Sequence, residues 1–148
     1  MASRNLRWLR HWGPAMAWAA LIWTFSTESF SAAGTSRILL PLLRWLFPHA
    51  DAGTLEWVHF VIRKCGHIGE YLFFSLLLLR GIRAGRREWK WTWAVAAVAM
   101  AAVYAALDEF HQSFVPSRGA SALDALLDTC SAALTQVGAW LWSRRRAP

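Results

Sequence analysis

Four long apolar blocks constrain the fold of this 148-residue chain more than any other feature of its sequence. Their apolar residues run on without the alternation of an amphipathic strand or helix, which favours lipid over water as the solvent. At about 1.5 Å per residue, a helix of about 17 to 23 residues crosses the hydrocarbon core of a bilayer. We therefore expect one domain, residues 1–148, that is all-α and polytopic, with four transmembrane helices in a bundle over about residues 11–27, 60–80, 90–109 and 120–142.

The second block is the least apolar of the four. Its purely apolar part, residues 71–79, is too short to cross a bilayer alone, so the polar half at residues 64–70 must be shielded by other helices. Two alternatives remain open, a soluble helical bundle and a cleaved signal peptide over the first block. Within that block, Trp18 and Trp23 make a weak signal-peptide core and favour an uncleaved helix.

The charged residues predict the orientation. If both termini lie on one side of the membrane, that side carries a net charge of +10, and the other side carries −3. By the positive-inside rule both termini are cytoplasmic and the protein lies in the cytoplasmic membrane. The basic excess is then a topology signal with added attraction for anionic lipid, and it is not a nucleic-acid patch. The basic residues of the cytoplasmic side are Arg4, Arg7, Arg10, Arg80, Arg83, Arg86, Arg87, Lys90, Arg144, Arg145 and Arg146.

The tryptophans agree with this orientation. They are concentrated at the cytoplasmic ends of the expected helices, as in the aromatic belt at a membrane interface. The residues concerned are Trp8, Trp12, Trp89, Trp91, Trp93, Trp140 and Trp142.

The segment between the first two spans, residues 28–56, contains the apolar stretch 38–47, which is interrupted by Pro41. This stretch is too short to span, so we expect an interfacial or re-entrant segment on the outer side. If it is helical, Arg37 and Arg44 share a face that meets lipid phosphates. A loop packed on the helix ends is an equally open alternative.

Ionisable and polar residues collect where the second span begins, the third ends and the fourth begins, and the topology places all three points at the outer side. An acid near the hydrocarbon costs about 2.5 to 3.5 kcal/mol, so such residues predict a functional site. The candidate catalytic residues are His67, Glu70, Asp108 and Glu109. The candidate ligand-binding residues are Lys64, Tyr71, Gln112, Arg118, Asp124 and Asp128.

Helical spacing orders this cluster within each span. In the second span, Glu70 lies one turn after His67, and Gly66 and Gly69 would permit close helix approach. In the third span, Asp108, His111 and Gln112 share a face with Tyr104. The fourth span carries a polar stripe that we expect to face the bundle interior, at Asp124, Asp128, Ser131 and Thr135, with Ala125, Leu126 and Leu127 turned toward lipid.

The cluster holds more acids than fixed positive charges. Some carboxyls are therefore protonated, or His67 or His111 carries charge, or a divalent cation binds. No tight metal signature is present, and a purely structural salt-bridge network is a further alternative. Arg118 has the geometry to bind a phosphate or carboxylate group, with Lys64 as a second charge. A histidine with a neighbouring acid would serve as general base if a reaction occurs.

These residues resemble the VanZ-like family of bacterial membrane proteins. The resemblance covers the second span to the middle of the fourth and, more loosely, the first span through Trp23 and Ser26. It rests on a Lys-x-x-His-x-x-Glu-Tyr pattern, an Asp-Glu-x-x-Gln-x-Phe-x-Pro-x-Arg pattern and one further Asp, at Lys64, His67, Glu70, Tyr71, Asp108, Glu109, Gln112, Phe114, Pro116, Arg118 and Asp124. Asp128 also fits, but Ser131 and Thr135 stand where glycines are common in the family.

The resemblance implies a multi-pass envelope protein, in a family whose founding member is tied to resistance to the glycopeptide teicoplanin. We expect a protein that binds a lipid-linked or cell-wall head group at the outer leaflet and lowers glycopeptide access. A membrane-embedded hydrolase or transferase, acting on a phosphate-bearing or acyl head group through the His/Asp/Glu cluster, is the alternative. The expected partners are membrane lipid, a lipid-linked cell-wall precursor or a glycopeptide.

Overall fold

The computed structural model describes the backbone of residues 2–145 and the side chains of residues 5–145, and this part of the chain is helical with no strand. The all-α prediction is therefore confirmed. The elements, in order, are α1 (Ala2–Phe25), the 3-10 turn η1 (Glu28–Phe30), α2 (Ala32–Leu46), α3 (Ala52–Arg83), α4 (Trp91–Gln112) and α5 (Ala122–Arg145).

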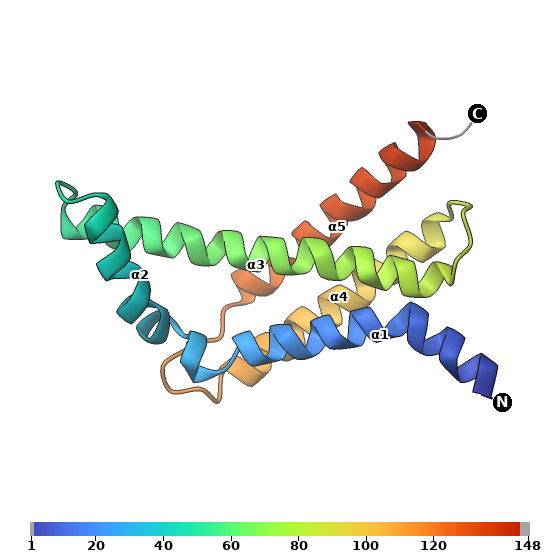
Figure 1. Cartoon of the computed structure of the whole chain (residues 1–148), viewed down its shortest axis with the longest axis horizontal. Coiled ribbons are helices and arrows are strands. Elements are labelled where there is room, and N and C mark those ends of the chain that lie inside the picture. Colours follow the sequence, from blue (N-terminus) through green and yellow to red (C-terminus); the bar gives the residue numbers. More distant parts are fainter. Residues whose placement is uncertain (1, 146–148) are drawn as a thin grey trace.

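The long helix α3 organises the molecule (Figure 1). α1, α4 and α5 all pack against it, and α5 also packs against α4. Both ends of the chain and the α3–α4 loop lie at one end of the molecule, whereas α2 folds back along the first turns of α3 at the other end (Figure 1). The loop between α4 and α5 therefore lies at the opposite end from the termini.

Local capping sets the limits of α3. Asp51 is its N-cap, and the carboxylate accepts hydrogen bonds from the Thr54 hydroxyl at 2.7 Å and the Thr54 backbone N–H at 2.9 Å. These two bonds hold the pKa of the Asp51 carboxyl below its usual value. The helix ends where Ala84 and Gly85 take the left-handed conformation, with φ of 48° and 87°.

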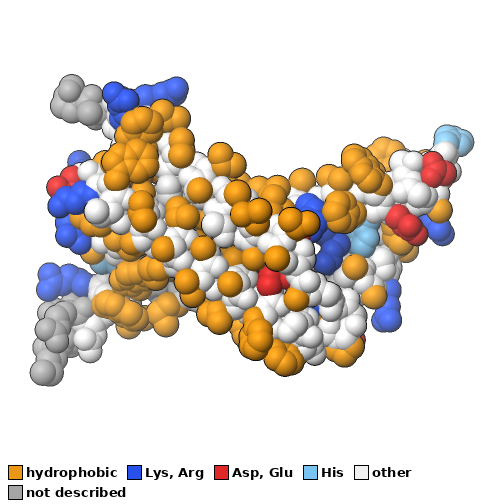
Figure 2. Space-filling model, turned by 180° about the vertical axis from the view of Figure 1, so that it is seen from behind, with side chains coloured by type: hydrophobic (Ala, Val, Ile, Leu, Met, Phe, Trp, Pro, Cys, Tyr) orange, Lys and Arg blue, Asp and Glu red, His pale blue; other side chains and the backbone are white. Residues whose placement is uncertain are grey.

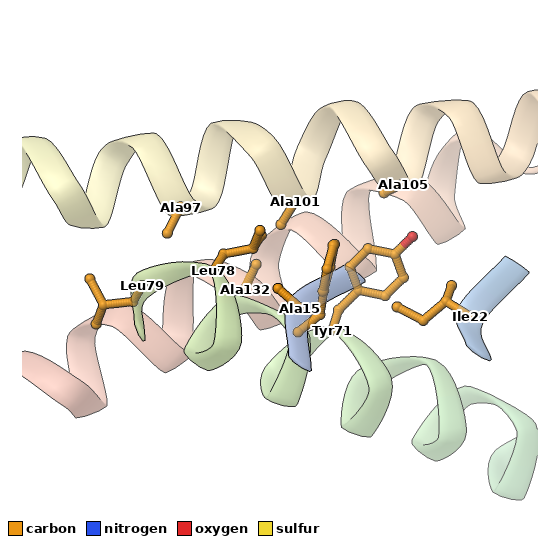
Figure 3. Packing of buried hydrophobic residues seen from close by; sticks show 10 residues of the cluster. Ala15, Ile22, Tyr71, Leu78, Leu79, Ala97, Ala101, Ala105 and Ala132 are labelled. Atoms are coloured by element: carbon orange, nitrogen blue, oxygen red, sulfur yellow. The ribbon is translucent and has the colours of Figure 1, made fainter. Parts of the chain in front are cut away.

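A stripe of small residues lets α4 approach its neighbours closely. Ala97, Ala101 and Ala105 are fully buried and contact Tyr71 and Leu78 of α3 and Ala132 of α5. Figure 3 shows the Tyr71 ring lying between these alanines and Ile22 of α1. Small residues in such positions bring helix backbones together, which is the usual packing of membrane helices.

Large apolar side chains are exposed on this molecule while some acids are buried in it. Large apolar side chains such as Val95, Val103 and Leu134 are exposed, whereas Asp108 and Asp128 are buried. Hydrophobic side chains cover the middle of the molecule, and Lys and Arg gather at the end that carries the termini (Figure 2). Two helices, α3 and α4, are long and apolar enough to cross a membrane.

The helices extend beyond the expected spans. α3 has 32 residues and begins eight residues before the predicted boundary, so at about 1.5 Å per residue it is longer than the hydrocarbon core is thick. The stretch around Pro41 is a regular helix, α2, with Arg37 and Arg44 both exposed. The Arg4 side chain and all of Arg146 lie outside the described residues.

Three packing expectations were wrong. A Cβ at Gly66 or Gly69 would meet nothing within 4 Å, so neither glycine is a point of close helix contact. The glycine that does hold two helices together is Gly81, where a Cβ would lie 2.9 Å from the ring of Trp12. Ala125 packs against the core instead of facing lipid, because it sits beside the α4 contact of α5.

We predict opposite effects of alanine at two glycines of α3. Gly81→Ala forces the Trp12 ring to move and should lower the free energy of unfolding by about 1 to 3 kcal/mol. Gly69→Ala, in open space, should be neutral or raise it by up to about 1 kcal/mol, because alanine favours the helix. Thermal unfolding of the two purified variants measures both effects, and equal midpoints would contradict the packing of α1 on α3.

Candidate functional site

A pocket of about 270 Å³ lies where the end of α1, η1, α2, α3 and the α4–α5 loop meet. Three of the predicted site residues line it, His67, Glu70 and Arg118. The remaining lining residues are Phe25, Ser26, Phe30, Thr35, Leu39, Ile62, Arg63 and Gly66. The wall from α3 forms because Arg63, His67 and Glu70 are four and three residues apart and so share one face of the helix.

Two arginines from different elements converge on one wall of the pocket. Arg63 Nη1 donates to the Phe30 carbonyl at 2.9 Å, and Arg118 Nη2 donates to the same carbonyl at 2.6 Å and to that of Phe25 at 2.5 Å. Carbonyls at a helix end lack partners within the helix, so the guanidinium groups satisfy them and fasten the wall. In the described part of the chain, the buried Nε of Arg118 has no hydrogen-bond partner.

Both guanidinium groups stay charged in this position. Burial lowers the pKa of Arg118, and Arg63 lowers it further, while Asp108, Glu70 and Glu109 act in the opposite direction. An arginine titrates far above neutral pH, so these influences leave it protonated. The pocket therefore contains two fixed positive charges beside the single carboxylate of Glu70.

The histidine of the pocket has an acid behind it. Nδ1 of His67 lies 3.4 Å from Oδ2 of Asp128 on α5, and the Asp128 side chain is 1% exposed. Asp128 orients the imidazole through this contact and leaves Nε2 as the nitrogen that it does not engage. The other oxygen of Asp128, Oδ1, has no hydrogen-bond partner among the described residues.

Three further predicted residues hold the first turn of α5 and the loop before it in place. Lys64 of α3 forms an ion pair with Asp124 in the first turn of α5. Glu109 Oε2 accepts a hydrogen bond from the Ser121 backbone N–H at 2.6 Å and so ties the α4–α5 loop to α4. None of these three side chains lines the pocket.

Asp108 and Gln112 lie behind the pocket in a buried network. Ser26 Oγ donates to Asp108 Oδ1 at 2.5 Å, and Gln112 Nε2 donates to Asp108 Oδ2 at 2.8 Å. Ser26 itself lines the pocket, so this network joins the chain just after α1 to α4. Tyr71 is in the core, and His111 stacks on Trp23 with the ring centroids 4.0 Å apart.

The predicted cluster is thus divided into a pocket and its supports. Most of its acids have their own ion-pair or hydrogen-bond partners. The polar stripe of α5 faces the bundle interior through Asp128, Ser131 and Thr135. Within the residues described, no group of three His, Cys, Asp or Glu side chains is arranged to hold a metal ion.

Sequence reasoning missed the contribution of α2 and underrated Arg63. Thr35 Oγ1 lies 3.0 Å from His59 Nε2 and accepts a hydrogen bond from Arg63 Nη1 at 3.3 Å, so α2 supports the same wall. The position of Arg63 one turn before His67 was a usable signal in the sequence. No local signal in the sequence predicted that α2 packs against α3, because this contact depends on how the turn between the two helices folds the chain back.

Comparison with known proteins gives one match. A family model described as VanZ/LLP1 matches residues 12–143, which include all the residues of the pocket. No curated protein and no solved structure matches the chain.

We predict that Ser26→Ala destabilises the protein. The variant removes the hydroxyl that donates to the buried Asp108, so the free energy of unfolding should fall by about 1 to 3 kcal/mol. Ser36→Ala is the control, because that hydroxyl bonds only the Ala33 carbonyl of its own helix. Thermal unfolding in one detergent compares the variants, and a Ser26→Ala midpoint equal to that of the control would exclude this network as a stabilising contact.

Proposed function

Because the chain belongs to the VanZ/LLP1 family, we propose that it is a four-span protein of the bacterial cytoplasmic membrane that binds a lipid-linked or cell-wall head group. The head group occupies the pocket between Arg63, His67, Glu70 and Arg118 at the outer leaflet. The single observation that carries the proposal is the convergence of two arginines, from α3 and from the α4–α5 loop, on this small pocket.

The exposed apolar surface supports four spans. α1 and α5 pack against α3, and both turn large apolar side chains outward, including Met16 and Leu21 on α1 and Leu126 and Leu134 on α5. With α3 and α4 already apolar enough to cross, two further crossings keep both termini on one side. The concentration of arginines at that end supports a cytoplasmic position for the termini.

The lining of the pocket supports an anionic head group. Two guanidinium groups offer planar donors that suit phosphate or carboxylate oxygens. Leu39, Ile62 and Phe25 give the same pocket an apolar portion, and Glu70 and His67 provide partners for hydroxyl or amino groups. Its volume of about 270 Å³ suits a head group and is too small for a glycopeptide.

Head-group binding at this position offers a physical route to resistance. A glycopeptide such as teicoplanin acts on cell-wall precursors outside the cytoplasmic membrane. A protein that holds the lipid-linked precursor by its head group lowers the amount that is free to meet the drug. Membrane lipid and a lipid-linked precursor are therefore the partners that we assign to the pocket.

Filling the pocket tests the proposal without removing a charge. Gly66 lines the pocket, and a side chain there meets nothing within 4 Å, so Gly66→Leu projects into the space that the head group would occupy. We expect it to weaken binding of undecaprenyl diphosphate to the full-length protein in phosphatidylcholine nanodiscs by roughly tenfold or more, about 1.4 kcal/mol.

Gly69→Leu is the matched control, since Gly69 is on the same helix, equally open and outside the pocket. It should bind the probe as the unsubstituted protein does. Unchanged binding by Gly66→Leu, or equal losses in both variants, would rule out the pocket as the head-group site.

The contact between His67 and Asp128 favours a second candidate, a hydrolase or transferase for the same head group. In this mechanism Nε2 of His67 takes a proton from water, the water oxygen forms the new bond to the phosphorus or acyl carbon, and the proton passes to the leaving oxygen.

Turnover separates the two candidates. If the protein is a hydrolase, the unsubstituted chain releases inorganic phosphate from undecaprenyl diphosphate, and His67→Gln should lower kcat by about 100-fold or more with a small change in KM. A binding protein releases no phosphate above the level of empty nanodiscs. Phosphate release that His67→Gln leaves unchanged would exclude the histidine as the base.

A further inference from the structure

A second and larger cavity, of about 1160 Å³, lies at the end of the molecule that carries the termini. It is bounded by the last turns of α3, the α3–α4 loop and the last turns of α5. Figure 1 shows α5 rising away from α3 toward its C-terminal end, which opens this space between the two helices. The pocket of the proposed function is at the opposite end of the molecule and shares no lining residue with it.

The rim of the cavity is strongly basic. Arg80, Arg83, Arg87 and Arg144 line it, against one acid, Glu88. Glu88 is itself paired with Lys90 at 3.3 Å, and none of the four arginines forms an ion pair with a described residue. The cavity therefore presents an uncompensated positive charge to any ligand that enters it.

The interior of the cavity is apolar. Leu76 and Leu79 of α3 and Ala139 of α5 form its deeper wall, and Trp89, Trp140 and Trp142 stand beside the arginines. Arg144 lies over the Trp140 ring with 5.1 Å between the guanidinium carbon and the ring centroid. This order of side chains matches a phospholipid, whose head group would lie against the positive charges, whose interfacial part would lie against the tryptophans and whose acyl chains would lie against the aliphatic residues.

We infer that this cavity binds an anionic phospholipid of the leaflet that faces the termini. Its phosphate is held by the rim arginines, and an acyl chain lies along Leu76 and Leu79 between α3 and α5. Basic pockets between membrane helices hold anionic head groups in this way. A soluble anion would use the rim alone and would leave the apolar wall unfilled.

The four rim arginines form two pairs, which differ in whether their side chains hold the backbone in place. Arg80 and Arg83 donate to backbone carbonyls, Arg80 to those of Arg10 and His11 and Arg83 to those of the following loop. Arg87 and Arg144 make no side-chain hydrogen bond to a described residue. Substitution of this second pair therefore removes ligand contacts and leaves the fastening of the loop in place.

Native mass spectrometry of the full-length protein tests the inference. The protein is exchanged into detergent micelles with equal amounts of phosphatidylglycerol and phosphatidylcholine, and the retained lipid is identified. We expect preferential retention of phosphatidylglycerol, and Arg87→Gln with Arg144→Gln should weaken it by roughly tenfold. The charge-matched control is Arg7→Gln with Arg10→Gln, two exposed arginines of α1 outside the cavity, which should retain the lipid.

Equal retention of the two lipids, or equal losses in both double variants, would overturn the inference. Displacement of phosphatidylglycerol by millimolar glycerol 3-phosphate would do so as well, because it would show that the rim alone accounts for binding. If Arg87→Gln with Arg144→Gln fails to fold, Leu76→Gln tests the acyl wall through the same preference, since Leu76 is exposed at 44%. Gly66→Leu should leave this binding unchanged, so failure here is distinct from failure of the head-group pocket.

Discussion

The structure depends on one constraint, that polar groups buried among these helices must be satisfied by other helices. Lipid offers no hydrogen bonds, so each buried donor or acceptor without a protein partner costs several kcal/mol. Asp108 meets this requirement through Ser26, the residue that follows α1, and through Gln112 of its own helix. Ser75 of α3 meets it through the Ala132 carbonyl and Gln136 of α5. These bonds join the helices where small residues bring them close, so packing and polar satisfaction reinforce each other.

The same constraint shapes the pocket. α1 ends at Phe25, and its last carbonyls need donors from outside the helix. Arg118 supplies them from the α4–α5 loop, and the ion pair between Lys64 and Asp124 holds the start of α5 beside α3. Several of the charges that the sequence placed in one cluster thus join α3, α4, α5 and the α4–α5 loop to one another. Arg63, His67, Glu70 and Arg118 line the pocket, and the proposed head-group site rests on these four residues.

The apolar blocks located α1, α3, α4 and α5 along the chain but gave the ends of these helices poorly. Apolar content marks where a helix contacts lipid or core, but α3 continues to Asp51 because a capping side chain, and not a change in polarity, starts it. Pro41 was read as an interruption, yet α2 passes through it. Within the site, spacing placed His67 and Glu70 on one face correctly. It did not reveal that Glu109 binds the Ser121 N–H or that Gly81 receives Trp12, since both contacts depend on where a distant segment packs.

The two ends of the molecule differ in the kind of charge that they hold. At the end that carries the α4–α5 loop, Lys64 of α3 pairs with Asp124 of α5, and the small pocket holds two arginines beside Glu70. At the end with the termini, the arginines of the large cavity lack acidic partners among the described residues and stand over tryptophans and leucines. A lipid phosphate between α3 and α5 would supply the negative charge that the chain itself does not provide there. On this view the lipid phosphate neutralises the arginines at the basic end, as Asp124 neutralises Lys64 at the opposite end. The last turns of α5 would then depend on the membrane for their electrostatic partner.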